Sequence, residues 1–243
     1  PALGFCLSIT LVAVILPVSI LTFWIFRGIA ANESFRLLWQ PALNSITVSG
    51  LASLMAIISA LPVAILATRF PRRASVVLER LTYMGYSLPH IVVALALVSF
   101  GLYAVPVLYQ SIALLVFGYV ILFLPIAAGA LRASLLQINP HIEEAAKGLG
   151  NSSWQVFRAI TLPLAKPGIL AGSALVFLVT MKELPVTLIL SPIGFTTLAT
   201  SIWAADTGVF FAQTAAAALP LIVSSSLAVF LILLQEQRIV SGK

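Results

Sequence analysis

Long apolar stretches limit what this sequence can fold into more than any other feature does. A helix of about 20 apolar residues crosses the roughly 30 Å hydrocarbon core of a membrane. Windows of this kind lie at about 5–26, 43–67, 82–104, 111–131, 167–190 and 214–235. Lipid offers no hydrogen-bond partner to a free peptide group, so each window is expected to be helical. We therefore predict an all-α membrane protein in which residues 1–243 form a single domain of six transmembrane helices.

The composition agrees with a lipid surrounding. Charged residues make up 8% of the chain, whereas soluble domains carry about 25% charged residues. The net charge of +6 fits membrane orientation, so no nucleic acid is expected as a partner. Cys6 is the only cysteine, which excludes a disulfide within the chain. Because the first residue is Pro1 rather than Met, we expect a processed chain or part of a longer one.

The basic residues predict how the chain is oriented in the membrane. Most of them follow the second or fourth window or lie in the tail: Arg69, Arg72, Arg73, Arg80, Arg132, Lys147, Arg158, Lys166, Arg238 and Lys243. The alternate connections carry only Arg27 and Arg36. The positive-inside rule therefore places both termini and the polar insert after the fourth window in the cytoplasm. Arg69, Arg72 and Arg73 are expected to anchor this orientation beside anionic lipid.

Prolines and small residues suggest bent, closely packed helices. Each window has an interior proline, which removes a backbone hydrogen bond and bends a helix. These prolines are Pro17, Pro62, Pro89, Pro125, Pro185 and Pro220. Small residues at four-residue spacing would allow helices to approach closely; they are Ala52, Ala56, Ala60, Gly168 and Gly172. The pattern favours a bundle of bent helices around a pathway.

The polar insert begins with the signals of a short helix. Asn139 followed by Pro140 predicts a capped helix start. Glu143 and Glu144 in the first turn suit the helix dipole. Glu143 also precedes Lys147 by four residues, the spacing of a helical ion pair. We expect a short polar helix that starts at Pro140.

The rest of the insert predicts a sharp bend and a second short helix. Gly150 can adopt the left-handed conformation that ends a helix, and Ser152 with Gln155 forms a capping-box pattern. Leu162-Pro163 is expected to close the second helix. The insert would therefore be a bent helix pair on the cytoplasmic face.

The second short helix carries Trp154, Phe157 and Ile160 at three-residue spacing. A unit this small has no core of its own to bury them. The three side chains could lie on the lipid surface, fold back under the bundle, or enter a pocket on another protein. The residues alone leave these alternatives open.

The spacing within the insert resembles a known motif. Glu144-Ala145-Ala146, three residues, Gly150, nine residues and Ile160-Thr161-Leu162-Pro163 match the EAA motif of binding-protein-dependent importers. The chain thus resembles a type I ABC importer permease. The resemblance implies that residues 139–163 are a coupling helix pair that docks into a groove on a cytoplasmic ABC ATPase dimer. The residues it assigns to coupling are Glu143, Glu144, Ala145, Ala146, Gly150, Trp154, Phe157, Ile160, Leu162 and Pro163.

The chain has no nucleotide-binding loop of its own. Its only Gly-Lys pair is Gly242-Lys243, so the phosphate-cradling G-x-x-x-x-G-K-[ST] pattern is missing. No zinc-ligand spacing and no nucleophile–His–acid arrangement suggests an enzyme. We expect a transport subunit that binds no cofactor itself. The resemblance implies that ATP and Mg bind in the partner ATPase, which performs the hydrolysis.

Lys182 and Glu183 lie inside an apolar window, where each charge would cost about 2.5–3.5 kcal/mol at the membrane centre. Pro185 should break or bend the helix beside them. Either the span ends early and both charges reach the outer headgroups, or they line a translocation pathway or gate. His90 could face the same cavity or simply pack. Glu183 is a weak candidate for contact with a metal ion passing through, because hard cations favour oxygen ligands.

The region around these charges is similar to ferric-iron ABC permeases. The matching residues are Lys182 to Pro185, Gly194, Phe195, Thr197, Leu198, Ala199, Thr200, Trp203 and the stretch Leu88 to Gly101. The resemblance implies the second half of a two-repeat chain in a bacterial inner membrane. A second permease half and a periplasmic binding protein would be its partners, with ferric iron as cargo. Thiamine, polyamine and phosphonate permeases share this ancestry and remain alternatives.

Two readings from other classes compete with the importer. An ion-coupled secondary transporter would use Lys182 and Glu183 as a proton or ion relay. A membrane scaffold without transport would leave the charged, interrupted span unexplained. The energy source discriminates, because transport that persists without ATP and collapses with an uncoupler favours the secondary transporter.

Overall fold

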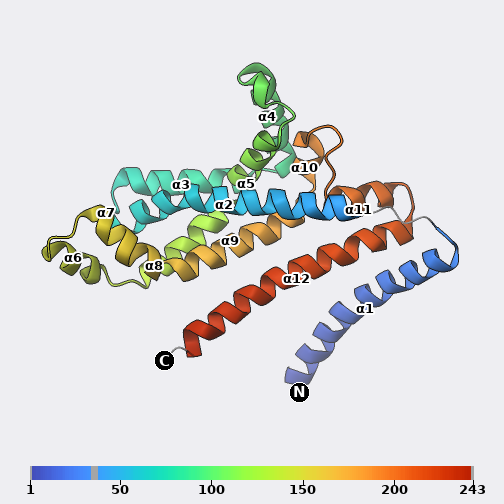
Figure 1. Ribbon diagram of the computed structural model, residues 1–243, viewed down its shortest axis with the longest axis horizontal. Helices are drawn as coiled ribbons and strands as arrows, with labels where there is room; N and C mark the ends of the chain where they lie inside the picture. Colours follow the sequence, from blue (N-terminus) through green and yellow to red (C-terminus); the bar gives the residue numbers. More distant parts are fainter. Residues whose placement is uncertain (1, 34–37, 242–243) are drawn as a thin grey trace.

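The computed structural model describes residues 2–33 and 38–241 and, within these ranges, contains helices and their connections without a strand (Figure 1). Pro1, Arg36 and Lys243 lie outside the described residues. The α-helices are α1 (Ala2–Ala30), α2 (Trp39–Arg69), α3 (Arg73–Ser87), α4 (His90–Tyr103), α5 (Ile112–Leu136), α6 (Pro140–Gly148), α7 (Ser153–Val156), α8 (Leu162–Leu164), α9 (Lys166–Met181), α10 (Pro185–Leu190), α11 (Leu198–Thr207) and α12 (Phe211–Ser241). A 3-10 helix, η1 (Pro106–Leu108), and a π-helix, η2 (Phe157–Thr161), complete the set.

Helices α2, α5 and α9 pack together at the centre of the molecule (Figure 1). The small residues predicted to permit close packing do so: Ala52, Ala56 and Ala60 of α2 are fully buried. A Cβ placed on Gly168 of α9 would lie 2.4 Å from the Cβ of Ser134 in α5. Such closeness requires glycine, so the α5–α9 contact depends on this residue.

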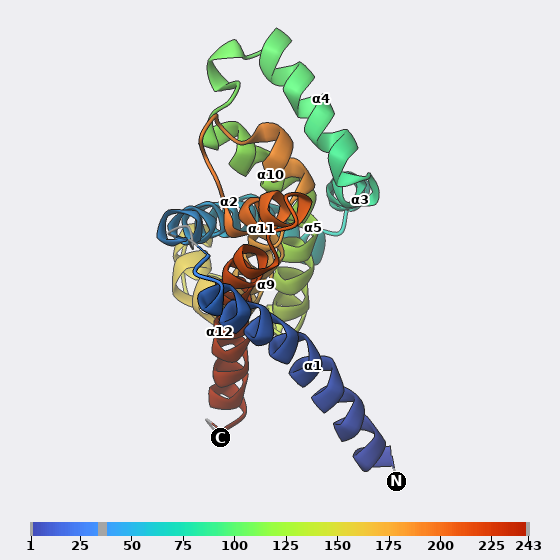
Figure 2. The ribbon, with the colours of Figure 1, turned by 90° about the vertical axis from the view of Figure 1, so that its right-hand side faces the viewer.

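Helix α1 packs along α12 at the edge of the bundle, where the rings of Trp24 and Phe211 lie 4.7 Å apart. Figure 2 shows the N-terminal part of α1 diverging from the other helices. Side chains along most of α1 are exposed although the helix is apolar. A surface of this kind needs lipid or another apolar chain against it.

The third apolar window was expected to form one span, and the structure shows that it is not one continuous helix. It divides between α3 and α4, which meet at an angle of 103°. Leu88 has an extended backbone at φ −89° and ψ 147°, the conformation favoured before proline because the Pro ring excludes a helical predecessor. Pro89 then begins the new direction, and α4 leaves the axis of the bundle (Figures 1 and 2).

The fifth window is also interrupted. Helix α9 ends at Met181 and α10 begins at Pro185. Pro89 and Pro185 therefore mark breaks, whereas the other interior prolines lie within continuous helices; these are Pro17, Pro62, Pro125 and Pro220. Among the residues that the structure describes, α1, α2 and α5 can each cross a membrane alone. Up to five spans result if two bent pairs each count as one, the pair α3–α4 and the pair formed by residues 153–164 with α9. Six crossings stay a prediction.

Candidate functional site

The first short helix of the polar insert forms as its sequence predicts. The Asn139 side-chain oxygen accepts a hydrogen bond from the His141 N–H at 3.0 Å, and Pro140 occupies the first turn, where its missing N–H costs nothing. Helix α6 ends at Gly148, and Gly150 follows with φ +87°. A Cβ on Gly150 would meet no atom within 4 Å. Glycine is needed there for its backbone conformation rather than for space.

The second short helix begins with the predicted capping box. Ser152 Oγ accepts from the Gln155 N–H, and the Gln155 side chain accepts from the Ser152 N–H. The helical segment that starts there runs through the π-helix η2 and α8 and ends at Leu164, so the end predicted at Leu162-Pro163 is met within one residue. The chain then bends by 62° into α9. Pro163 has no N–H to donate to the preceding turn, which explains the widened turn just before this end.

The apolar side chains of the insert point mostly outward. Trp154 is 66% exposed, and its ring lies 5.4 Å from that of Phe157, which is half-buried. Leu149, at the bend, is 85% exposed. Of the other residues assigned to coupling, Ala145 and Pro163 are exposed, Ile160 and Leu162 are half-buried, and Ala146 is buried. Trp154 therefore does not fold back under the bundle.

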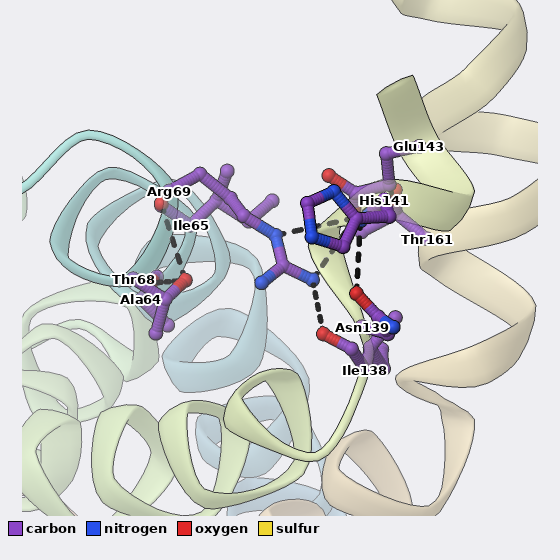
Figure 3. Close-up of polar contacts among 9 residues, drawn as sticks. All are labelled: Ala64, Ile65, Thr68, Arg69, Ile138, Asn139, His141, Glu143 and Thr161. Carbon is purple, nitrogen blue, oxygen red and sulfur yellow. Dashed lines mark hydrogen bonds and ion pairs between the residues drawn. The ribbon is translucent and has the colours of Figure 1, made fainter. Parts of the chain in front are cut away.

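The two adjacent glutamates of α6 have different surroundings. The Glu144 side chain is 69% exposed and lies 2.9 Å from His141 Nδ1. The Glu143 carboxylate turns inward to Arg69 of α2, at 3.1 Å (Figure 3). This arrangement corrects two expectations: Glu143 pairs with Arg69 rather than Lys147, and Arg69 is a largely buried ion-pair partner rather than a lipid anchor. Arg72 and Arg73 are exposed, so their lipid role stays a prediction.

A second polar cluster joins the two helix breaks. Glu183, 7% exposed, lies between α9 and α10, and its Oε2 is 2.9 Å from His90 Nδ1 at the start of α4. Its Oε1 accepts from the Val186 N–H at 3.2 Å, which caps α10. Lys182 is exposed and Pro185 is half-buried. The structure thus brings together His90 and Glu183, two candidates that lie 93 residues apart in the sequence.

The cluster continues into the core through residues that sequence reasoning missed. The Thr187 hydroxyl donates to the Glu183 backbone oxygen. Because that hydroxyl has one proton, the Tyr119 O–H donates to Thr187 Oγ1, at 2.7 Å. No local sequence pattern predicts the contact between Tyr119 and Thr187, which lie 68 residues apart in the chain. The pairing of Arg69 with Glu143 had a partial signal in the sequence. Arg69 lies in the connection after the second window and Glu143 in the connection after the fourth, and the basic residues place both connections on the same side of the membrane.

The described part of the chain contains no group of three or more His, Cys, Asp or Glu side chains arranged to hold a metal ion. Both oxygens of Glu183 already accept hydrogen bonds. A metal ion at this carboxylate would therefore have to share it with His90 and the Val186 N–H. The cluster is better suited to holding the two helix breaks together than to binding an ion tightly.

A cavity of about 590 Å³ lies near the starts of α2 and α12, at the end of the bundle opposite to α6 and α7 (Figure 1). Its walls include Gln40, Phe195, Thr200, Trp203, Phe210 and Gln213. The loop before α11 is fastened to α2 by two hydrogen bonds, from Asn44 Nδ2 to the Thr196 oxygen and from the Leu198 N–H to Ser45 Oγ, both at 2.8 Å. The stretch from Gly194 to Trp203 therefore shapes this cavity. Asp206 beyond it is exposed.

Comparison with known proteins gives a consistent result. A family described as "Binding-protein-dependent transport system inner membrane component" matches residues 52–241. The chain is 35% identical over 231 residues to the Fe(3+)-transport system permease protein FbpB 2 of Haemophilus influenzae. This alignment covers 94% of this chain and 46% of that protein. The chain thus spans about half the length of this relative. It is 32% identical over 163 residues to the molybdenum transport system permease protein ModB of Escherichia coli, with 62% of this chain and 70% of that protein covered.

The fold also has a solved counterpart. A chain of a bacterial alginate ABC transporter, solved in complex with an alginate pentasaccharide-bound periplasmic protein, has a TM-score of 0.68. The match covers 98% of this chain and 92% of that chain at 17% identity. At this identity the likeness concerns the fold.

Proposed function

Because this chain belongs to the family of binding-protein-dependent transport system inner membrane components, we propose that it is a permease subunit of an ATP-driven importer. It forms half of a translocation pathway, and a second permease half supplies the rest. A periplasmic protein delivers cargo to the outer face. A separate ATPase dimer, which binds ATP and Mg, drives the change of access from the cytoplasm.

The exposed bend of the polar insert is the observation that carries this proposal. Gly150 has φ +87°, and Leu149 and Trp154 project beside it without cover from the described part of this chain. Apolar side chains on a water-exposed helix pair are stable when a partner protein buries them. The EAA spacing supports an ABC ATPase as that partner.

The orientation and the number of crossings are part of the same proposal. Basic residues at the end of the bundle that carries α6 and α7 support a cytoplasmic location for that end. The bent pair α3–α4 and the interrupted pair α9–α10 each serve as one crossing, and α12 supplies the last. Both termini of this segment then lie in the cytoplasm.

Ferric iron is the cargo we propose, supported by the 35% identity to the Fe(3+)-transport permease. The identity to ModB makes molybdate a further alternative, beside thiamine, polyamines and phosphonates. Binding of these ligands to the cognate periplasmic protein tests the choice. Selective binding of ferric iron supports it, and preference for another ligand overturns it. His90, Lys182, Glu183 and Pro185 would then act at the gate rather than as fixed ligands.

Uptake by proteoliposomes tests the coupling role. Gly150→Val should reduce ATP-driven uptake severely, because a β-branched residue resists the left-handed conformation. Gly148→Ala is the matched control, since its Cβ also meets open space but its backbone is helical. Unchanged ATP-driven uptake by Gly150→Val would refute the coupling role. Uptake that needs no ATP and collapses with an uncoupler would instead identify a secondary transporter.

A further inference from the structure

Helix α6 has few attachments to the rest of the chain. All of its residues are described, and Ala146 is buried and Glu143 largely buried, whereas its other side chains are exposed. A helix that docks on a partner protein can transmit movement only if it is also attached to the other helices of its own chain. Without such a contact, displacement of the docked helix would only bend the segments that connect it. Glu143 is the charged side chain that provides such an attachment.

The Glu143 carboxylate is the centre of a four-part junction (Figure 3). Its Oε1 accepts hydrogen bonds from Arg69 Nε at 3.2 Å, from Arg69 Nη2 at 3.1 Å and from Thr161 Oγ1 at 3.0 Å. Arg69 Nη2 also donates to the Ile138 oxygen at 3.3 Å. The junction thus joins the end of α2, the α5–α6 connection, α6 and η2.

The side chains of this junction are largely shielded from water. The Arg69 and Glu143 side chains are 11% and 12% exposed, and Ile138 and Thr161 are buried. The Coulombic attraction of an ion pair grows with burial while desolvation opposes it, and loss of one partner leaves the other charge buried without compensation. The neighbouring Glu144, by contrast, faces solvent.

The covalent routes out of the helix pair both pass through breaks. On one side, Gln137 to Asn139 separate α5 from α6 without regular helix. On the other side, the chain bends by 62° between α8 and α9. The Arg69–Glu143 contact leads directly from α6 to α2, which is continuous from Trp39 to Arg69 and packs against both α5 and α9.

We propose that Arg69 is a positioning residue for coupling: through Glu143 it fixes α6 to the end of α2, so that movement of α6 on the partner ATPase moves α2. The proposal rests on the importer function above. It divides the roles of the adjacent glutamates, since Glu143 holds the permease side and Glu144 faces the ATPase.

The test uses the complete transporter in proteoliposomes, with its ATPase and binding protein, and measures cargo imported per ATP hydrolysed. Arg69→Gln should still co-purify with the ATPase and hydrolyse ATP, but import per ATP should fall about tenfold, within the range of usual coupling effects. Arg69→Lys keeps the charge and should retain most of the import. The double variant Arg69→Glu with Glu143→Arg should recover part of the loss in either single charge reversal.

Arg132→Gln is the matched control, because it breaks an Arg–Glu pair of 2.8 Å with Glu79 that joins α5 to α3 and does not involve α6. It should leave import per ATP unchanged. An unchanged ratio in Arg69→Gln overturns the proposal, as does loss of ATPase co-purification, which would make the pair part of the docking surface. If Arg69→Gln does not reach the membrane, failure of Arg69→Lys or of the double variant to restore the ratio overturns it.

The two proposals fail separately. If Gly150→Val also imports normally with ATP, the coupling role of the insert is wrong. If Gly150→Val abolishes import while Arg69→Gln imports normally, only the proposal that Arg69 transmits the movement is wrong, and the coupling role of the insert stands.

Discussion

At the scale of single residues, neighbours in the sequence have opposite surroundings. Glu143 and Glu144 are adjacent, yet successive helical residues point about 100° apart, so one enters a buried junction and the other faces solvent. Lys182 and Glu183 show the same division, with the lysine exposed and the glutamate buried. A motif that names several residues therefore does not assign them one role.

Gly168 provides a test of packing at this scale. Gly168→Ala should destabilise the protein by about 1–3 kcal/mol, because the new methyl group overpacks against Ser134 in α5. Gly50→Ala is the control, since a Cβ on Gly50 meets no atom within 4 Å. Thermal unfolding in detergent measures both. Equal midpoints for the two variants would contradict the close α5–α9 contact.

At the scale of elements, helix breaks depend on tertiary partners. Pro89 and Pro185 stand at helix breaks, at the starts of α4 and α10, whereas Pro62 and Pro125 lie within continuous helices. At Pro185 the preceding Glu183 supplies a cap for α10 and a bond to His90. A break is stable where the freed polar groups find partners, and the local sequence does not name those partners.

The Glu183 cluster gives the prediction for this scale. Glu183→Ala removes the acceptor of the Val186 N–H and the partner of His90, so we expect a loss of about 1–3 kcal/mol for each group left unsatisfied. Lys182→Ala, at the exposed neighbour, should change the unfolding midpoint little. Comparable stability of the two variants would show that the cluster does not hold α4 and α10 together.

Much of the fold follows from local signals in the sequence. Apolar windows predicted the long helices, and Asn139, Ser152 and Gly150 predicted both starts and the bend of the polar insert. Contacts between distant residues could not be predicted from these local signals. For example, nothing in the sequence near Arg69 specifies the Glu143 carboxylate, 74 residues away, as its partner. The sequence likewise did not predict that Tyr119 reaches Thr187.

At the scale of the whole molecule, the two ends of the bundle differ in chemistry. One end carries the bent pair α6–α7, with Leu149 and Trp154 exposed beside basic residues. The other carries a cavity whose walls combine amide, hydroxyl and aromatic side chains with leucine, proline and alanine residues. This asymmetry agrees with the proposed importer, in which one end would meet the ATPase and the other would receive cargo. The exposed apolar length of α1 suits lipid or the second permease half.

Site-directed cross-linking in the purified transporter tests the motor contact most directly. Cys6 is replaced by Ser, and single cysteines are introduced by Leu149→Cys, by Trp154→Cys and, as a control at the cavity end, by Trp203→Cys. We expect Leu149→Cys and Trp154→Cys to form adducts with the nucleotide-hydrolysing subunit, and Trp203→Cys to form none. Absence of these adducts, or labelling of Leu149→Cys from the periplasmic side, would contradict the account.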